Sequence, residues 1–176
     1  MTDFRKSIEC PEKWNLLREI GKKTGLDTLV ETGGYHGATM EYLRNDFKRL
    51  VTIELGEGLY KDIYNLGIPN VLCLWGDSGR VLEQFLLFYN EPALFWLDAH
   101  PSGGDTVSAD DPSMGNELRS VLRRNCRADI VLVDDVGQPG LEQEYISSIV
   151  DGFPEWQVQL NGTIALVTAK RSVNNA

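Results

Sequence analysis

Acidic side chains follow two apolar runs of the sequence and could together hold a metal ion. Asp98 follows one run, and the pair Asp134 and Asp135 follows the next. If both runs are neighbouring parallel strands, the three carboxylates lie at one edge of a sheet, where they repel one another unless one is protonated or a cation binds. Aspartate oxygens suit Mg²⁺. We therefore predict a metal site at Asp98, Asp134 and Asp135. The alternative is that Asp134 and Asp135 only cap the loop after their strand.

His100 stands two residues after Asp98, so the two side chains share a face if the strand continues through them. An imidazole can take up or release a proton near neutral pH. We predict Asp98 and His100 as catalytic residues, with His100 as a general base or a further metal ligand. The alternative for Asp98 is that it alone binds the substrate or the amino group of a cofactor. The loop-forming segment 101–115 could form a lid over a substrate, and the alternative is a disordered loop.

A glycine-rich turn follows the first apolar run of the chain. Its sequence is ETGGYHG over residues 31–37. Glycines in such a turn let a backbone approach a ligand closely. We predict that Glu31, Gly33, Gly34 and Gly37 bind a cofactor. The alternative is a tight strand-to-helix turn that binds no ligand.

Two further strand ends carry acids that suit a nucleoside. Glu54 lies 23 residues beyond Glu31, close to the offset of about 20 residues at which dinucleotide-binding folds place a carboxylate against a ribose. A carboxylate can accept hydrogen bonds from both hydroxyls of a ribose. After the third run, Asp77 could accept from an adenine amino group while Ser78 caps the next helix, or Asp77 could be the cap itself. We predict Glu54, Asp77, Ser78 and also Asp98 as cofactor-binding residues.

An alternation of strands and helices is needed to bring these residues together. The apolar runs lack polar alternation, which is typical of parallel strands that are covered on both faces. They span residues 26–31, 50–55, 70–75, 93–97 and 129–133. Helical patterns span residues 11–23, 38–45, 58–65, 79–89, 113–124 and 141–150. This order predicts an α/β fold with a doubly wound, mostly parallel, Rossmann-like sheet.

The end of the chain departs from this alternation. Two β-rich runs, 156–160 and 163–169, flank Asn161-Gly162, which is the strongest two-residue signal for a β-hairpin. We therefore predict a seven-stranded sheet that ends in an antiparallel hairpin. We expect residues 1–176 to form a single domain, with a leading helix within 1–25 and the Rossmann-like core in 26–176.

Composition and charge narrow the classes of partner. The 176 residues are 42% hydrophobic and 24% charged, as in one globular domain. The formal net charge of -9 disfavours nucleic acid as a partner, because binding to phosphates depends on Lys and Arg. No membrane-spanning or secretory segment is present in the pattern, so we expect a cytoplasmic protein. The scattered cysteines predict free thiols. The sequence leaves open whether the chain forms a homo-oligomer.

Several features together resemble the S-adenosylmethionine-binding elements of class I methyltransferases, namely Glu31-x-Gly33-x-x-x-Gly37, Glu54, Gly76-Asp77-Ser78 and the final hairpin. The resemblance covers nearly the whole chain. It implies that Gly33 and Gly37 let the backbone pass the amino-acid half of S-adenosylmethionine, that Glu54 holds the ribose hydroxyls and that Asp77 lies beside adenine. A nicotinamide dehydrogenase would share the turn and the ribose acid, but the chain lacks the G-x-G-x-x-G spacing.

The three aspartates match the positions at which metal-dependent O-methyltransferases of the catechol and antibiotic-tailoring kinds carry their acids. The resemblance implies an S-adenosylmethionine-dependent methyltransferase that acts on an oxygen of a small-molecule acceptor or sugar, with Mg²⁺ assistance as an option. Such a metal fixes the substrate hydroxyl and lowers its pKa. The alternatives are a non-catalytic module that binds S-adenosylmethionine and a module that binds another nucleotide.

Overall fold

Strands and helices alternate along the chain as the sequence predicts. The structure is a computed structural model that describes residues 10–99 and 113–170. The helices are α1 (Pro11–Thr24), α2 (Ala38–Leu43), α3 (Glu57–Asn65), α4 (Ser78–Leu86), α5 (Ser113–Arg123) and α6 (Gln143–Asp151). The strands are β1 (Thr28–Thr32), β2 (Arg49–Glu54), β3 (Val71–Trp75), β4 (Leu94–Leu97), β5 (Ile130–Val133), β6 (Trp156–Asn161) and β7 (Ile164–Ala169).

The strands form one seven-stranded sheet in the order β3-β2-β1-β4-β5-β7-β6. Strands β1 to β5 pair in parallel, and β7 lies antiparallel to both β5 and β6. The predicted doubly wound sheet with a final antiparallel hairpin is therefore confirmed. The chain runs outward from β1 to β3 and returns to place β4 on the other side of β1. Ligands of open α/β sheets bind at such a switch point, outside the carboxyl ends of the strands.

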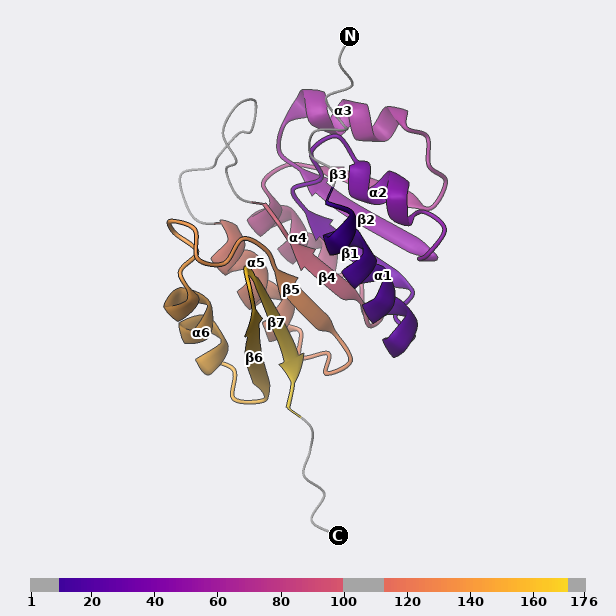
Figure 1. Cartoon of the computed structure of the whole chain (residues 1–176). Coiled ribbons are helices and arrows are strands. Elements are labelled where there is room, and N and C mark those ends of the chain that lie inside the picture. Colours follow the sequence, from indigo (N-terminus) through magenta and orange to yellow (C-terminus); the bar gives the residue numbers. More distant parts are fainter. Residues whose placement is uncertain (1–9, 100–112, 171–176) are drawn as a thin grey trace.

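Each face of the sheet is covered by its own helices (Figure 1). Helices α4, α5 and α6 lie on one face. The core on this face includes Leu82, Leu118 and Ile146. Side chains of α1 and α2 pack on the other face, where the core includes Leu17 and Met40. Neighbouring residues of a strand point to opposite faces. The polar residues at one strand end are therefore divided between two separate environments.

Strand β3 does not follow the prediction that the apolar runs are covered on both faces. It is an edge strand, and it leaves Leu72 48% and Trp75 57% exposed. The run 71–75 has the same apolar composition as a central strand, so composition alone does not distinguish the edge from the centre. Cys73 is half-buried there, and burial raises the pKa of its thiol to about 12, which agrees with a structural thiol.

The hairpin turn is displaced by one residue from its predicted position. Asn161 still pairs with Ile164 at the end of the ladder, so the turn is formed by Gly162 and Thr163. Gly162 has φ +62°, and glycine at the first central position is typical of a type II′ turn. Within residues 10–99 and 113–170, no helix combines the length and apolar character that spanning a membrane requires.

Candidate functional site

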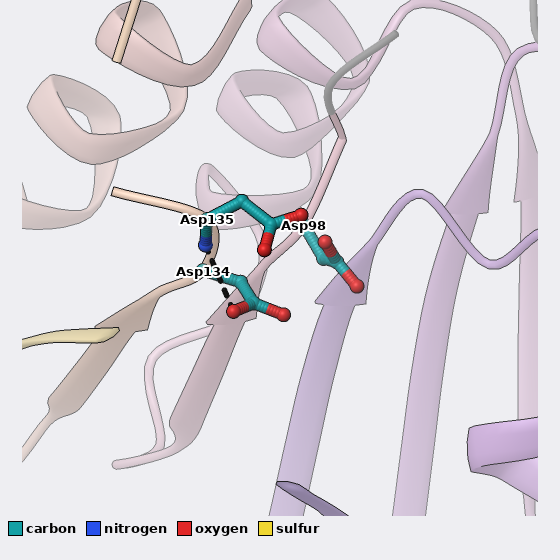
Figure 2. A group of neighbouring side chains, drawn as sticks. All are labelled: Asp98, Asp134 and Asp135. Carbon is teal, nitrogen blue, oxygen red and sulfur yellow. Dashed lines mark hydrogen bonds between the residues drawn. The ribbon is translucent and has the colours of Figure 1, made fainter. Parts of the chain in front are cut away.

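The three predicted metal ligands meet at the carboxyl ends of β4 and β5. One carboxylate oxygen from each of Asp98, Asp134 and Asp135 lies within 4.8 Å of the other two. Figure 2 shows the three side chains gathered above the two strand ends. Asp134 is fully buried, and its Oδ1 accepts a hydrogen bond from the Asp135 backbone N–H at 2.8 Å. This bond within the pair holds the Asp134 carboxylate at the start of the loop after β5.

A lysine from the leading helix reaches into this acidic trio of Asp98, Asp134 and Asp135. Lys13 Nζ lies 2.5 Å from Asp134 Oδ2 and 3.6 Å from Asp135 Oδ1. Burial raises the pKa of Asp134, and the charge of Asp98 adds to this, whereas Lys13 opposes it. Burial lowers the pKa of Lys13, but its contacts with the acids outweigh burial, so its pKa is raised overall. Lys13 therefore stays charged and offsets part of the negative charge.

The glycine turn after β1 is in contact with the end of β4. Gly33 has φ +78°, and a Cβ atom there would lie 2.8 Å from the carbonyl oxygen of Asp98. Gly34 lies against β2, because a Cβ atom at this position would clash with Thr52 Oγ1. Gly37 packs on α3 and begins α2 in a left-handed conformation, with φ +78°. The glycines thus allow close packing around the turn and bring Gly33 next to the acidic trio.

Glu54 is held by backbone N–H groups at the end of β2. Its Oε2 accepts from the N–H of Tyr35 in the glycine turn at 2.8 Å, and its Oε1 accepts from the N–H of Gly56 at 2.7 Å. Each carboxylate oxygen has two acceptor positions, so these bonds leave acceptor capacity on both oxygens. Tyr35 has φ +47°, which is uncommon for a residue other than glycine. The turn and Glu54 therefore form one connected unit.

Glu31 is buried beneath the glycine turn on the face of the sheet covered by α2. Its carboxyl group accepts a hydrogen bond from Thr52 Oγ1 at 3.0 Å and is bonded to Thr39 of α2. Thr39 also accepts from the indole N–H of Trp14 at 3.0 Å. Burial raises the pKa of Glu31 to about 8, while its bond with Thr39 opposes this shift. Glu31 therefore links α2 to the strands as a protonated acid at pH 7.

Asp77, and not Ser78, caps helix α4. Asp77 is the N-cap of α4, since its Oδ1 accepts from the Arg80 N–H at 3.0 Å. Ser78 is the first residue of the helix and donates from its hydroxyl to Glu117 Oε1 at 2.5 Å. The prediction that Ser78 caps α4 is wrong, and the alternative cap is correct. The second carboxylate oxygen of Asp77 keeps its acceptor capacity.

Glu117 is a fully buried acid that sequence reasoning missed. It comes from α5 and accepts from Ser78 Oγ and from Thr32 Oγ1, the latter at 2.8 Å. Thr32 Oγ1 in turn accepts from the backbone N–H of Asp98 at 3.2 Å. Glu117 lies three residues after the buried Met114, and this placement on the apolar face of α5 was the signal that could have found it.

The predicted catalytic pair is only partly described. β4 ends at Leu97, as the apolar run predicts, so Asp98 follows the strand and the condition for a face shared with His100 is not met. His100 and most of the predicted lid, 101–115, lie outside the described residues. Lys13 was also missed, because a charged residue in the first turn of an amphipathic helix is ordinarily solvent-exposed.

Solved structures of methyltransferases have a similar fold. The S-adenosylhomocysteine-bound methyltransferase PaMTH1 from Podospora anserina matches with a TM-score of 0.69 and 13% identity, over 94% of this chain and 81% of that one. The O-methyltransferase TomG from Streptomyces achromogenes, in complex with S-adenosylmethionine, matches with a TM-score of 0.67 and 16% identity. The match covers 93% of this chain and 82% of TomG. An O-methyltransferase from Bacillus cereus in complex with S-adenosylhomocysteine matches with a TM-score of 0.62 and 15% identity. The match covers 92% of this chain and 82% of that one.

No protein-family model and no curated protein sequence matches the chain. The likeness to the solved structures concerns the fold, and it agrees with the sheet order and the final hairpin. The chain therefore has the class I fold of S-adenosylmethionine-dependent methyltransferases, as the resemblance of its motifs implied.

Proposed function

We propose that this chain is an S-adenosylmethionine-dependent methyltransferase that methylates an oxygen of a small-molecule acceptor with the assistance of Mg²⁺. The observation that carries the proposal is the acidic trio within 4.8 Å at the ends of β4 and β5, next to the switch point and beside the glycine turn. Two structures of similar fold contain S-adenosylhomocysteine and one contains S-adenosylmethionine. The proposed cofactor and metal sites lie next to each other, as methyl transfer between them requires.

The proposed cofactor site runs along the carboxyl ends of β1, β2 and β3. Glu54 would accept from the two ribose hydroxyls with the acceptor capacity that its backbone partners leave. Asp77 would accept from the adenine amino group while it caps α4. Gly33, Gly34 and Ser78 shape the floor of the site, and Glu31 supports the turn from below.

The acidic trio fits a divalent cation by its donor chemistry. Three carboxylates carry three negative charges when ionised, and Lys13 brings one positive charge against them. Hard oxygen ligands of this kind suit Mg²⁺. When bound, Mg²⁺ supplies charge that favours the ionised acceptor hydroxyl, and S-adenosylmethionine supplies the methyl group on a positively charged sulfur. Asp98, Asp134 and Asp135 would hold the cation, and the Asp135 N–H fixes the orientation of Asp134.

Two further parts of the proposal concern the acceptor. His100 is proposed as the base that takes the hydroxyl proton, because it follows Asp98 by two residues. The acceptor is proposed to be a small hydroxylated molecule, because neighbouring hydroxyls can bind one cation together. A homo-oligomer that completes the pocket is compatible with the proposal.

The test measures transfer of a labelled methyl group from S-adenosylmethionine to a panel of catechols and sugars, with Mg²⁺ or with a chelator. We expect transfer that needs Mg²⁺ and that falls at least about 100-fold in Asp98→Asn, because the metal loses a ligand. Asp151→Asn, an exposed acid at the end of α6, is the matched control and should leave the rate unchanged. Equal rates with the chelator would contradict the role of Mg²⁺. Cofactor binding without transfer to any acceptor would favour the non-catalytic module.

A further inference from the structure

Lys13 occupies part of the acidic trio without a role in the proposed methyl transfer. Its ammonium contacts Asp134, whose side chain is fully buried, while 29% of the Lys13 side chain is exposed. The partly exposed Lys13 side chain therefore ends at a buried carboxylate oxygen.

The backbone that carries Lys13 is firmly placed. The neighbouring Trp14 is 7% exposed and donates its indole N–H to Thr39 of α2. Leu17, one turn further along α1, is fully buried in the core beneath it. These contacts do not involve the Lys13 side chain, so its flexible stem can move away from the trio while α1 stays in place.

An ammonium and a divalent cation at Asp134 Oδ2 disfavour each other. Lys13 Nζ lies 2.5 Å from this oxygen, and Mg²⁺ requires an oxygen ligand at about 2.0–2.1 Å in a near-octahedral arrangement. Two cations on one carboxylate oxygen would also repel each other strongly at this separation. Either cation satisfies the buried carboxylate, and the charge of one weakens the binding of the other.

We propose that Lys13 is an internal counter-ion that competes with the divalent metal for Asp134, and so sets the metal affinity of the site. Without metal, the ammonium balances the buried carboxylate. With metal, the Lys13 side chain turns toward solvent. The apparent affinity for metal is the intrinsic affinity multiplied by the fraction of molecules in which Lys13 has left the site. This inference rests on the metal site of the proposed function.

The test measures Mn²⁺ binding, by calorimetry and by the electron paramagnetic resonance signal of free Mn²⁺, to the metal-free full chain. We expect Lys13→Met to bind Mn²⁺ about tenfold or more tightly than wild type, because the competing charge is gone. Lys13→Arg should not gain affinity, since it keeps a cation. Lys61→Met is the matched control, because Lys61 pairs with Glu57 on α3, and its affinity should equal that of wild type. Lys13→Gln replaces Lys13→Met if the latter misfolds.

Stability gives a second readout that does not depend on activity. Lys13→Met should lower the Tm of the metal-free chain, because Asp134 loses its partner, and Mg²⁺ should restore it. Equal Mn²⁺ affinity in wild type and Lys13→Met, with binding lost in Asp134→Asn, would overturn the inference and leave the metal site intact. Absence of Mn²⁺ binding in both wild type and Lys13→Met would overturn the metal site and the inference together.

Discussion

Glu31 shows how one buried acid can make the stability of the whole chain depend on pH. Its pKa is raised from 4.5 to about 8 by burial, so its carboxyl group is protonated at pH 7 in the folded chain and ionised in the unfolded chain. Unfolding between these two pH values releases a proton. The contribution of Glu31 to stability is therefore complete below about pH 4.5 and is lost as the pH rises toward 8.

We predict that Glu31→Gln removes this pH dependence, because the amide is neutral at every pH. The free energy of unfolding of wild type should fall relative to that of Glu31→Gln by up to about 1.4 kcal/mol for each pH unit between pH 5 and 7.5. Denaturant unfolding of both proteins at several pH values measures the difference. Parallel pH profiles would show that Glu31 is ionised in the folded chain.

Glu117 joins three elements through its two carboxylate oxygens. Replacing it by alanine removes the acceptor of the Ser78 and Thr32 hydroxyls and leaves a cavity, so Glu117→Ala should lower the free energy of unfolding by about 3 kcal/mol. Glu117→Gln keeps the shape and should cost about 1 kcal/mol. Asn116→Ala, an exposed neighbour on α5, is the control and should change stability by less than about 0.5 kcal/mol. A loss in Glu117→Ala no larger than in the control would contradict the network.

At the scale of elements, substitutions of two glycines with nearly the same backbone conformation distinguish the cost of backbone strain from the cost of close packing. Gly25 has φ +76° with nothing within 4 Å of a Cβ atom, whereas Gly33 has φ +78° with the Asp98 carbonyl oxygen at 2.8 Å. Gly25→Ala should therefore cost only the left-handed conformation, about 1–2 kcal/mol. Gly33→Ala should cost clearly more and should weaken Mn²⁺ binding, because the end of β4 must move. Equal losses in thermal unfolding would mean that the β1–β4 contact can relax.

The helices and most strands could be predicted from sequence because the burial of each element determines where its apolar residues stand. Strands covered on both faces appear as unbroken apolar runs, and the residues after β1, β2, β4 and β5 then fall at one edge. The edge position of β3 could not be predicted, because Leu72 and Trp75 are apolar whether or not a neighbour covers them. Lys13 could not be predicted either, because its partner Asp134 lies 121 residues away and the pairing depends on how α1 packs.

At the scale of the whole molecule, the doubly wound sheet divides the support of the site between its two faces. Adjacent residues Glu31 and Thr32 point to opposite faces, where one bonds to Thr52 and Thr39 and the other to Glu117. The final hairpin is also tied to the site. The backbone N–H of Val136, which follows the acidic pair, donates to the Thr163 carbonyl oxygen in the hairpin turn at 2.8 Å. A ligand that spans these parts should stabilise the whole chain, by about 2.7 kcal/mol at a concentration of 100 Kd.

The central claim is that the carboxyl edge of this sheet binds S-adenosylmethionine through Glu54. Calorimetric titration with S-adenosylhomocysteine tests it most directly, on wild type, on Glu54→Gln and on the control Glu57→Gln, an exposed acid three residues further along. We predict saturable binding by wild type and by Glu57→Gln, and a Kd raised about tenfold or more in Glu54→Gln, because charged hydrogen bonds to the ribose are lost. No binding by wild type, or an unchanged Kd in Glu54→Gln, would contradict the account.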